Sequence, residues 1–131
     1  MNIWIFAPEK IVFAILAAQA VYSIATRMQL GILRFYKDLL HPLLSTLKMP
    51  LSVENKDVLQ LYVETAKSIR LLVKIGKPCL ARWRGLIVSG ISKCWLGISD
   101  TSGKEELEKE LREVVKELRI ALGSSLEVST N

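Results

Sequence analysis

Apolar residues recur every three or four positions over two long segments of this chain, which is the period of an α-helix. In the first segment they are Val58, Leu61, Tyr62, Thr65, Ile69, Leu72 and Val73. In the second they are Leu107, Leu111, Val114, Leu118 and Ala121. No alternation of apolar and polar residues typical of a β-strand lasts more than a few positions. The sequence therefore predicts an all-α chain, and residues 1–131 are the length of a single domain.

Prolines and glycines divide this chain into predicted segments. From residue 10 the chain runs without proline to Pro42, which predicts one helix of about thirty residues that stops or kinks near His41 and Pro42. Gly76 and Pro78 predict the end of the next helix, and Gly123 predicts the end of the last one. The expected parts are an apolar N-terminal arm and long helix (1–50), a basic helical hairpin (51–99), an acidic amphipathic helix (100–122) and a polar tail (123–131).

The predicted first helix contains sixteen consecutive uncharged residues between Lys10 and Arg27. A membrane span needs about 20 apolar residues, and this run is shorter and includes Gln19 and Tyr22. Arg34 follows Arg27 at helical spacing, so the helix continues as an amphipathic one. We expect this helix to pack on another subunit or at an interface, with a membrane span as the alternative.

Charge is distributed unevenly along the chain. Residues 1–99 carry thirteen Lys/Arg against five Asp/Glu, a net charge of +8, whereas residues 100–131 carry five against eight, a net charge of −3. No acidic residue lies between Glu64 and Asp100, although seven basic residues do. A surface of one sign repels itself unless a polyanion neutralises it, which indicates nucleic acid or anionic lipid as partner.

Several of these cations are spaced so that they share helix faces. Lys67, Arg70 and Lys74 follow each other at i, i+3 and i+7, and Arg27 and Arg34 lie seven residues apart. Such stripes suit the phosphate backbone of duplex DNA, which is bound without regard to sequence. The candidate nucleic-acid-binding residues are Arg27, Arg34, Lys67, Arg70, Lys74, Lys77, Arg82, Arg84 and Lys93. The alternative is an ordinary solvated face.

Three further residue types weigh on function. Trp83, between Arg82 and Arg84, is expected in a core or interface, with stacking on a base as the alternative. Cys79 and Cys94 are fifteen apart and, with a single histidine, cannot assemble a zinc site, so we expect both thiols to be buried. No Ser/His/Asp set, paired-acid site or glycine-rich phosphate loop is present. We therefore expect neither an enzyme nor a bound cofactor or metal.

The composition is depleted in thermolabile side chains, with three Gln, three Asn and abundant Glu and Lys, as in hyperthermophile proteins. Together with a long helix that carries Arg27 and Arg34, and a basic hairpin over 51–99, this resembles the major capsid (nucleocapsid) proteins of filamentous and rod-shaped viruses of hyperthermophilic archaea. The resemblance covers residues 8–97 and is one of architecture. The acidic residues 103–122 depart from it, and they are expected on an outer surface or at a subunit contact.

The resemblance implies a helical nucleocapsid in which paired subunits wrap double-stranded A-form DNA between their helices. The basic stripes would then line the DNA channel, and the first helix would pack on a neighbouring subunit, in a homo- or hetero-oligomer. Some members of that group are enclosed by a membrane, so contact with a lipid envelope is a further expectation.

The functional prediction is thus a structural DNA-packaging protein of the virion that self-assembles into a helical oligomer. The alternative is a small membrane-associated protein, in which residues 3–26 insert and the basic hairpin binds anionic head groups. A third hypothesis is a regulator that pairs through residues 103–122. Because they share a helix face without an acid nearby, Lys67 and Arg70 are predicted to be essential for DNA binding, so that replacing both by Glu abolishes it and leaves helicity unchanged.

Overall fold

A computed structural model describes residues 8–48, 56–77, 80–99 and 101–130. These residues form helices and short connections without a β-strand, which confirms the all-α prediction. The elements in chain order are α1 (Pro8–Met28), the 3-10 helix η2 (Gln29–Phe35), α2 (Tyr36–Lys48), α3 (Lys56–Ile75), α4 (Leu80–Gly97) and α5 (Glu105–Thr130).

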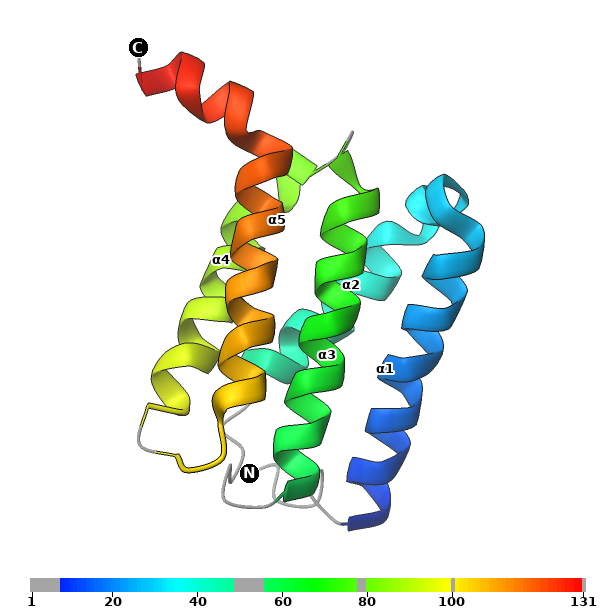
Figure 1. Ribbon diagram of the computed structural model, residues 1–131. Helices are drawn as coiled ribbons and strands as arrows, with labels where there is room; N and C mark the ends of the chain where they lie inside the picture. The colour runs from blue at the N-terminus through cyan, green and yellow to red at the C-terminus, as the bar shows by residue number, and fades with distance from the viewer. Residues whose placement is uncertain (1–7, 49–55, 78–79, 100, 131) are drawn as a thin grey trace.

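The helices form two layers (Figure 1). In this view α1, α3 and α5 lie side by side, while α2 crosses behind α3 and α4 lies behind α5. Helix α3 is the centre of the bundle because it packs against α1, α2 and α5. Its seven apolar positions predicted from the sequence are all buried.

The prediction of one long first helix is wrong, because the chain reverses direction at η2. Gln29 has a φ of +48°, in the left-handed region that breaks an α-helix, and its side-chain amide donates to the carbonyl of Thr26 at 2.7 Å. At Pro42, where a stop or a kink is predicted, the chain does not stop, because Pro42 lies inside α2. Burial of Leu44 and Leu47 holds this helix together past the proline, so packing outweighs the local preference.

Helix α1 packs against α3 through small residues. Its buried residues are seven apart, namely Ile11, Ala18 and Ala25, and the same spacing leads to the buried Ile32 of η2. The two alanines allow a close approach of the helices, and the hydroxyl of Ser68 on α3 donates to the carbonyl of Ala18 at 2.8 Å. This buried hydrogen bond fixes the register of α1 on α3.

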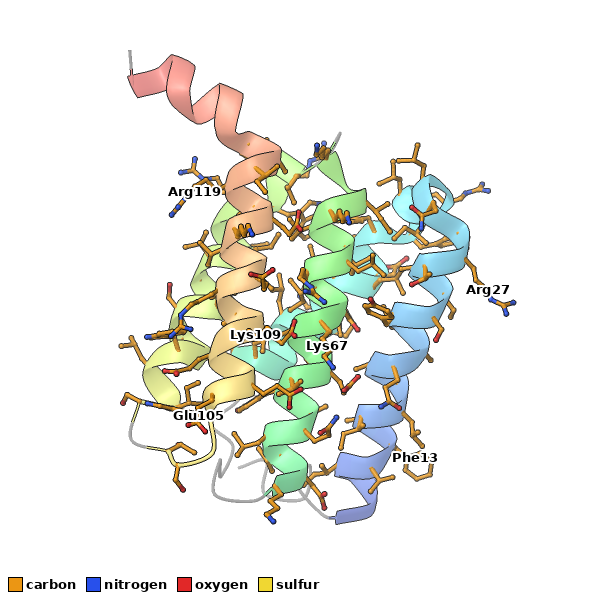
Figure 2. All side chains as sticks on the ribbon, in the orientation of Figure 1. Phe13, Arg27, Lys67, Glu105, Lys109 and Arg119 are labelled. Carbon is orange, nitrogen blue, oxygen red and sulfur yellow. The ribbon has the colours of Figure 1, made fainter. Side chains whose placement is uncertain are left out.

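The opposite face of α1 is apolar and uncovered. Its outer face consists of Val12, Phe13, Leu16, Ile24 and Met28, which are all exposed. Phe13 points away from the bundle in Figure 2 and is 70% exposed. By length and composition alone, the helical segment Lys10–Lys48 could cross a membrane, and only 17% of its most apolar stretch is buried.

Helix α5 covers the other side of α3. Its predicted apolar seam is buried at Leu107, Leu111, Val114 and Leu118. The helix continues to Thr130, so the predicted stop at Gly123 is wrong. The last turns bend away from the bundle (Figure 1), which is consistent with a glycine at the bend.

Tyr36 joins three segments at the end of the bundle where α3 finishes. Its hydroxyl donates to the carbonyl of Leu72 at 2.6 Å, and a side chain at Gly76 would overlap its ring. Trp83, in the first turns of α4, meets the Tyr36 ring edge to face, with the ring centroids 6.4 Å apart. The start of α2, the end of α3 and the start of α4 are therefore held together.

Candidate nucleic-acid interface

Two of the predicted DNA-binding residues are ion-paired within the chain. Lys67 lies 3.7 Å from the carboxylate of Glu64, one turn earlier on α3. The guanidinium of Arg70 lies 3.6 Å from the carboxylate of Glu110, which comes from α5. The expectation that no acid lies beside this stripe is wrong, because α5 packs alongside α3.

The charged side chains of α5 face two neighbouring helices, α3 and α4. Glu110 and Glu117 lie on the side facing α3, where Glu110 pairs with Arg70 and Glu117 lines a hollow with Lys74 and Lys77. Three cations, Arg112, Lys116 and Arg119, line a groove shared with α4. The acidic surplus of the C-terminal segment is thus partly matched by the cations of α3.

Other predicted DNA-binding cations have no such partner. Six exposed side chains form no ion pair with a carboxylate in the part of the chain that the structure describes, and we call them the basic end: Arg27, Arg34, Lys74, Lys77, Arg82 and Arg84. They come from the last turn of α1, from η2, from the end of α3 and from the start of α4. All four segments lie at the same end of the bundle, the upper end in Figure 1.

The packing around Tyr36 positions the basic end. Because Tyr36 touches Gly76 and Trp83, the segment with Lys74 and Lys77 lies next to the segment with Arg82 and Arg84. A hollow of about 660 Å³ opens here between η2, α3 and α5, lined in part by both lysines. The site can therefore present several cations to one extended polyanion.

The other predicted site residues lie elsewhere or serve packing. Lys93 is exposed on α4 but lies near Gly97, where that helix ends at the opposite end of the bundle. Trp83 is half-buried against Tyr36, as expected for a core residue, so its ring is partly covered. Lys67 and Arg70 lie in a separate hollow of about 360 Å³ between α1 and α3.

One of the two cysteines lies among the residues that the structure describes. Cys94 is buried as predicted, and burial raises the pKa of its thiol to about 12. Cys79 lies outside the described residues. Within residues 8–48, 56–77, 80–99 and 101–130, no three His, Cys, Asp or Glu side chains gather in a group that could hold a metal ion.

Comparison of this chain with models of known protein families, with curated proteins and with solved structures finds no match. Its function is therefore inferred from its own geometry and charge.

Proposed function

We propose that this protein is a non-enzymatic, structural DNA-packaging protein. It binds the phosphate backbone of duplex DNA through the basic end and self-associates through the outer face of α1. The observation that supports binding is the gathering of six exposed Lys and Arg side chains, without carboxylate partners among the described residues, at one end of the bundle.

Phosphate is the ligand that such a group of cations favours. Duplex DNA carries a charge every 1.7 Å of its axis, and neutralising it releases counterions. Arg82 and Arg84 can each form a forked pair with phosphate oxygens. No zinc-finger or basic-zipper pattern is present in the sequence, and Asn and Gln are scarce, so binding is expected to be independent of base sequence.

The outer face of α1 supports self-association. Phe13 and Leu16 are 70% and 54% exposed, and no charged residue lies between Lys10 and Arg27. Contiguous exposed apolar surface of this kind marks an interaction site. DNA binding combined with self-association is what a nucleocapsid subunit of a hyperthermophilic archaeal virus requires, and the virion is the location that we propose.

The first experiment removes charge from the basic end and compares it with the opposite end. Arg82→Ala with Arg84→Ala should weaken DNA binding at least tenfold and lower the slope of log K against log salt by about 1.8, since each lost phosphate contact removes about 0.9. The matched control is Lys56→Ala with Lys109→Ala, which removes two exposed lysines near the starts of α3 and α5. Equal losses in both variants, measured by fluorescence anisotropy, would contradict the assignment.

A membrane-associated function is the second candidate, and the uncovered face of α1 is the observation that favours it. In that case the protein should sediment with anionic vesicles and show no salt-dependent DNA binding. Phe13→Ser with Leu16→Ser should then release it from the vesicles. In the packaging proposal the same variant reduces self-association instead, measured by sedimentation velocity, and a single isolated subunit keeps its DNA contacts.

A further inference from the structure

Helices α4 and α5 lie at the edge of the bundle opposite α1 (Figure 1). Side chains of these two helices line an open groove. Its volume is about 680 Å³, and Trp95, Leu96 and Val115 contribute apolar surface to it. Leu96 is 73% exposed and Val115 is 38% exposed. Water therefore covers large apolar side chains here, and a partner that buries them would gain the hydrophobic term.

The exposed face of α4 at this edge includes small residues, so another helix can approach its backbone closely. Gly85, Val88, Ser92 and Leu96 follow each other at helical spacing on one exposed face of α4. No atom lies within 4 Å of a Cβ built at Gly85, so the backbone is open to solvent there. This face extends the groove along α4 beyond the hollow itself.

The α5 side carries a row of cations. Arg112, Lys116 and Arg119 lie at i, i+4 and i+7, which spans about 10 Å of helix. The Arg112 guanidinium lies over the Trp95 ring, 5.5 Å from its centroid, and 3.9 Å from the carboxylate of Glu108. Lys116 and Arg119 form no ion pair with any carboxylate in the described part of the chain, and Arg119 points away from α3 in Figure 2.

We propose that the α4–α5 groove binds an acidic amphipathic helix of a partner protein. The apolar stripe of that helix covers Trp95, Leu96 and Val115, and its carboxylates, spaced three or four residues apart, face the row of cations. This inference is independent of the DNA-packaging proposal, because no residue that lines the groove belongs to the basic end or to the outer face of α1.

The pattern of charge selects this occupant over others. A single anionic head group would neutralise one cation, whereas the row needs several carboxylates spread over about 10 Å. A phosphate backbone would leave the apolar floor uncovered. Among the described residues, a second copy of this chain offers an acidic amphipathic helix only in α5, and its apolar seam is already buried against α3 at Leu111 and Val114.

A labelled synthetic helix tests the groove directly. The probe is a peptide of about eighteen residues, roughly 27 Å of helix, with Leu along one stripe and Glu beside it. We expect fluorescence anisotropy to show saturable binding. Lys116→Glu with Arg119→Glu should weaken it at least tenfold, and Leu96→Ser should weaken it severalfold. Lys56→Glu, which changes an exposed charge at the start of α3 outside the groove, should leave it unchanged.

Two further probes decide what is recognised. A peptide with Lys in place of each Glu should bind the Lys116→Glu/Arg119→Glu variant better than the unchanged protein, which would support paired charges across the groove. A scrambled peptide of the same composition has no apolar stripe, and equal binding of it would overturn the proposal. The proposal is also overturned if Lys56→Glu causes the same loss, or if anionic vesicles bind in a manner sensitive to Lys116 and Arg119 while the helical peptide does not bind.

Discussion

The cations of the α3–α5 interface and most of those of the basic end come from the same stretch without acidic residues, between Glu64 and Asp100. They differ in whether a carboxylate lies beside them. At the interface, Arg70 lies 3.6 Å from the carboxylate of Glu110, which comes from a distant part of the chain, and Lys67 nearby on α3 lies 3.7 Å from Glu64 of its own helix. At the basic end, Lys77 and Arg82 have no ion-pair partner among the described residues. A cation of this acid-free stretch is therefore less available to a ligand where an acidic helix packs beside it, as α5 does beside Arg70.

This difference separates cations that stabilise the fold from cations available to a ligand. The side chain of Glu110 is only 8% exposed, and its Oε1 has no hydrogen-bond partner within the described residues. Arg70 is therefore the main group that stabilises the charge of Glu110. Replacing Arg70 would leave that carboxylate buried without an ion-pair partner among the described residues. Removing a cation from the basic end leaves nothing unpaired, and it should affect ligand binding more than stability.

The largest expected effect comes from destroying the interface itself. Leu111 is fully buried in the α5 seam, so Leu111→Asp places a charge in an apolar site and should reduce the free energy of unfolding by about 4 kcal/mol or more. Urea denaturation and sedimentation would measure the loss of folding and assembly. DNA affinity should fall only as far as assembly does.

The control for that variant is Glu106→Gln, which alters an exposed charge at the start of the same helix. It should change the free energy of unfolding by less than about 0.5 kcal/mol. If Leu111→Asp assembles normally, or if Glu106→Gln alone changes DNA binding tenfold, the role given to α5 is wrong.

A smaller effect is expected from the ion pair across the interface. Arg70→Ala should cost about 2–3 kcal/mol, because Glu110 is left buried without compensation, and the partial exposure of Arg70 keeps the cost below that of a fully buried pair. In a double-mutant cycle with Glu110→Gln, the coupling between the two side chains should be about 1–2 kcal/mol. Zero coupling would mean that the ion pair contributes nothing to the free energy of unfolding. The cations of the interface and of the basic end would then not differ in their effect on stability.

This interface also changes the expectation for the double variant Lys67→Glu with Arg70→Glu. It places like charges beside Glu64 and Glu110, so it should destabilise the fold as well as weaken DNA binding. Circular dichroism during urea denaturation, run beside the anisotropy titration, separates the two effects. A variant with unchanged stability and unchanged DNA affinity would remove both roles from these residues.

The smallest effect on stability is expected at the basic end. Arg27→Ala with Arg34→Ala should change the free energy of unfolding by less than about 0.5 kcal/mol, since both side chains are exposed and without carboxylate partners among the described residues. The salt dependence of DNA binding should nevertheless decrease. A large loss of stability with unchanged salt dependence would place these two arginines among the structural cations.

Local patterns in the sequence predicted the parts of this fold that depend on helical periodicity. The burial of Ile69 and Leu111 follows from spacing within one helix, so it needs no knowledge of neighbours. The reversal at Gln29 was missed because the apolar pattern continues through it without proline. The Arg70–Glu110 pair and the gathering of the basic end depend on which helices pack together, and spacing within one helix cannot give that.

Because Cys94 is buried, the reaction rate of its thiol can report how often α4 separates from the bundle. With a pKa of about 12, its thiol holds almost no reactive thiolate at neutral pH, whereas an exposed thiol in the unfolded chain ionises near 8.5. In a Cys79→Ser background, alkylation by iodoacetamide should therefore proceed only through molecules in which α4 has transiently separated from the bundle. The labelling rate then measures how often α4 opens, and a ligand seated against α4 should slow it in proportion to its occupancy.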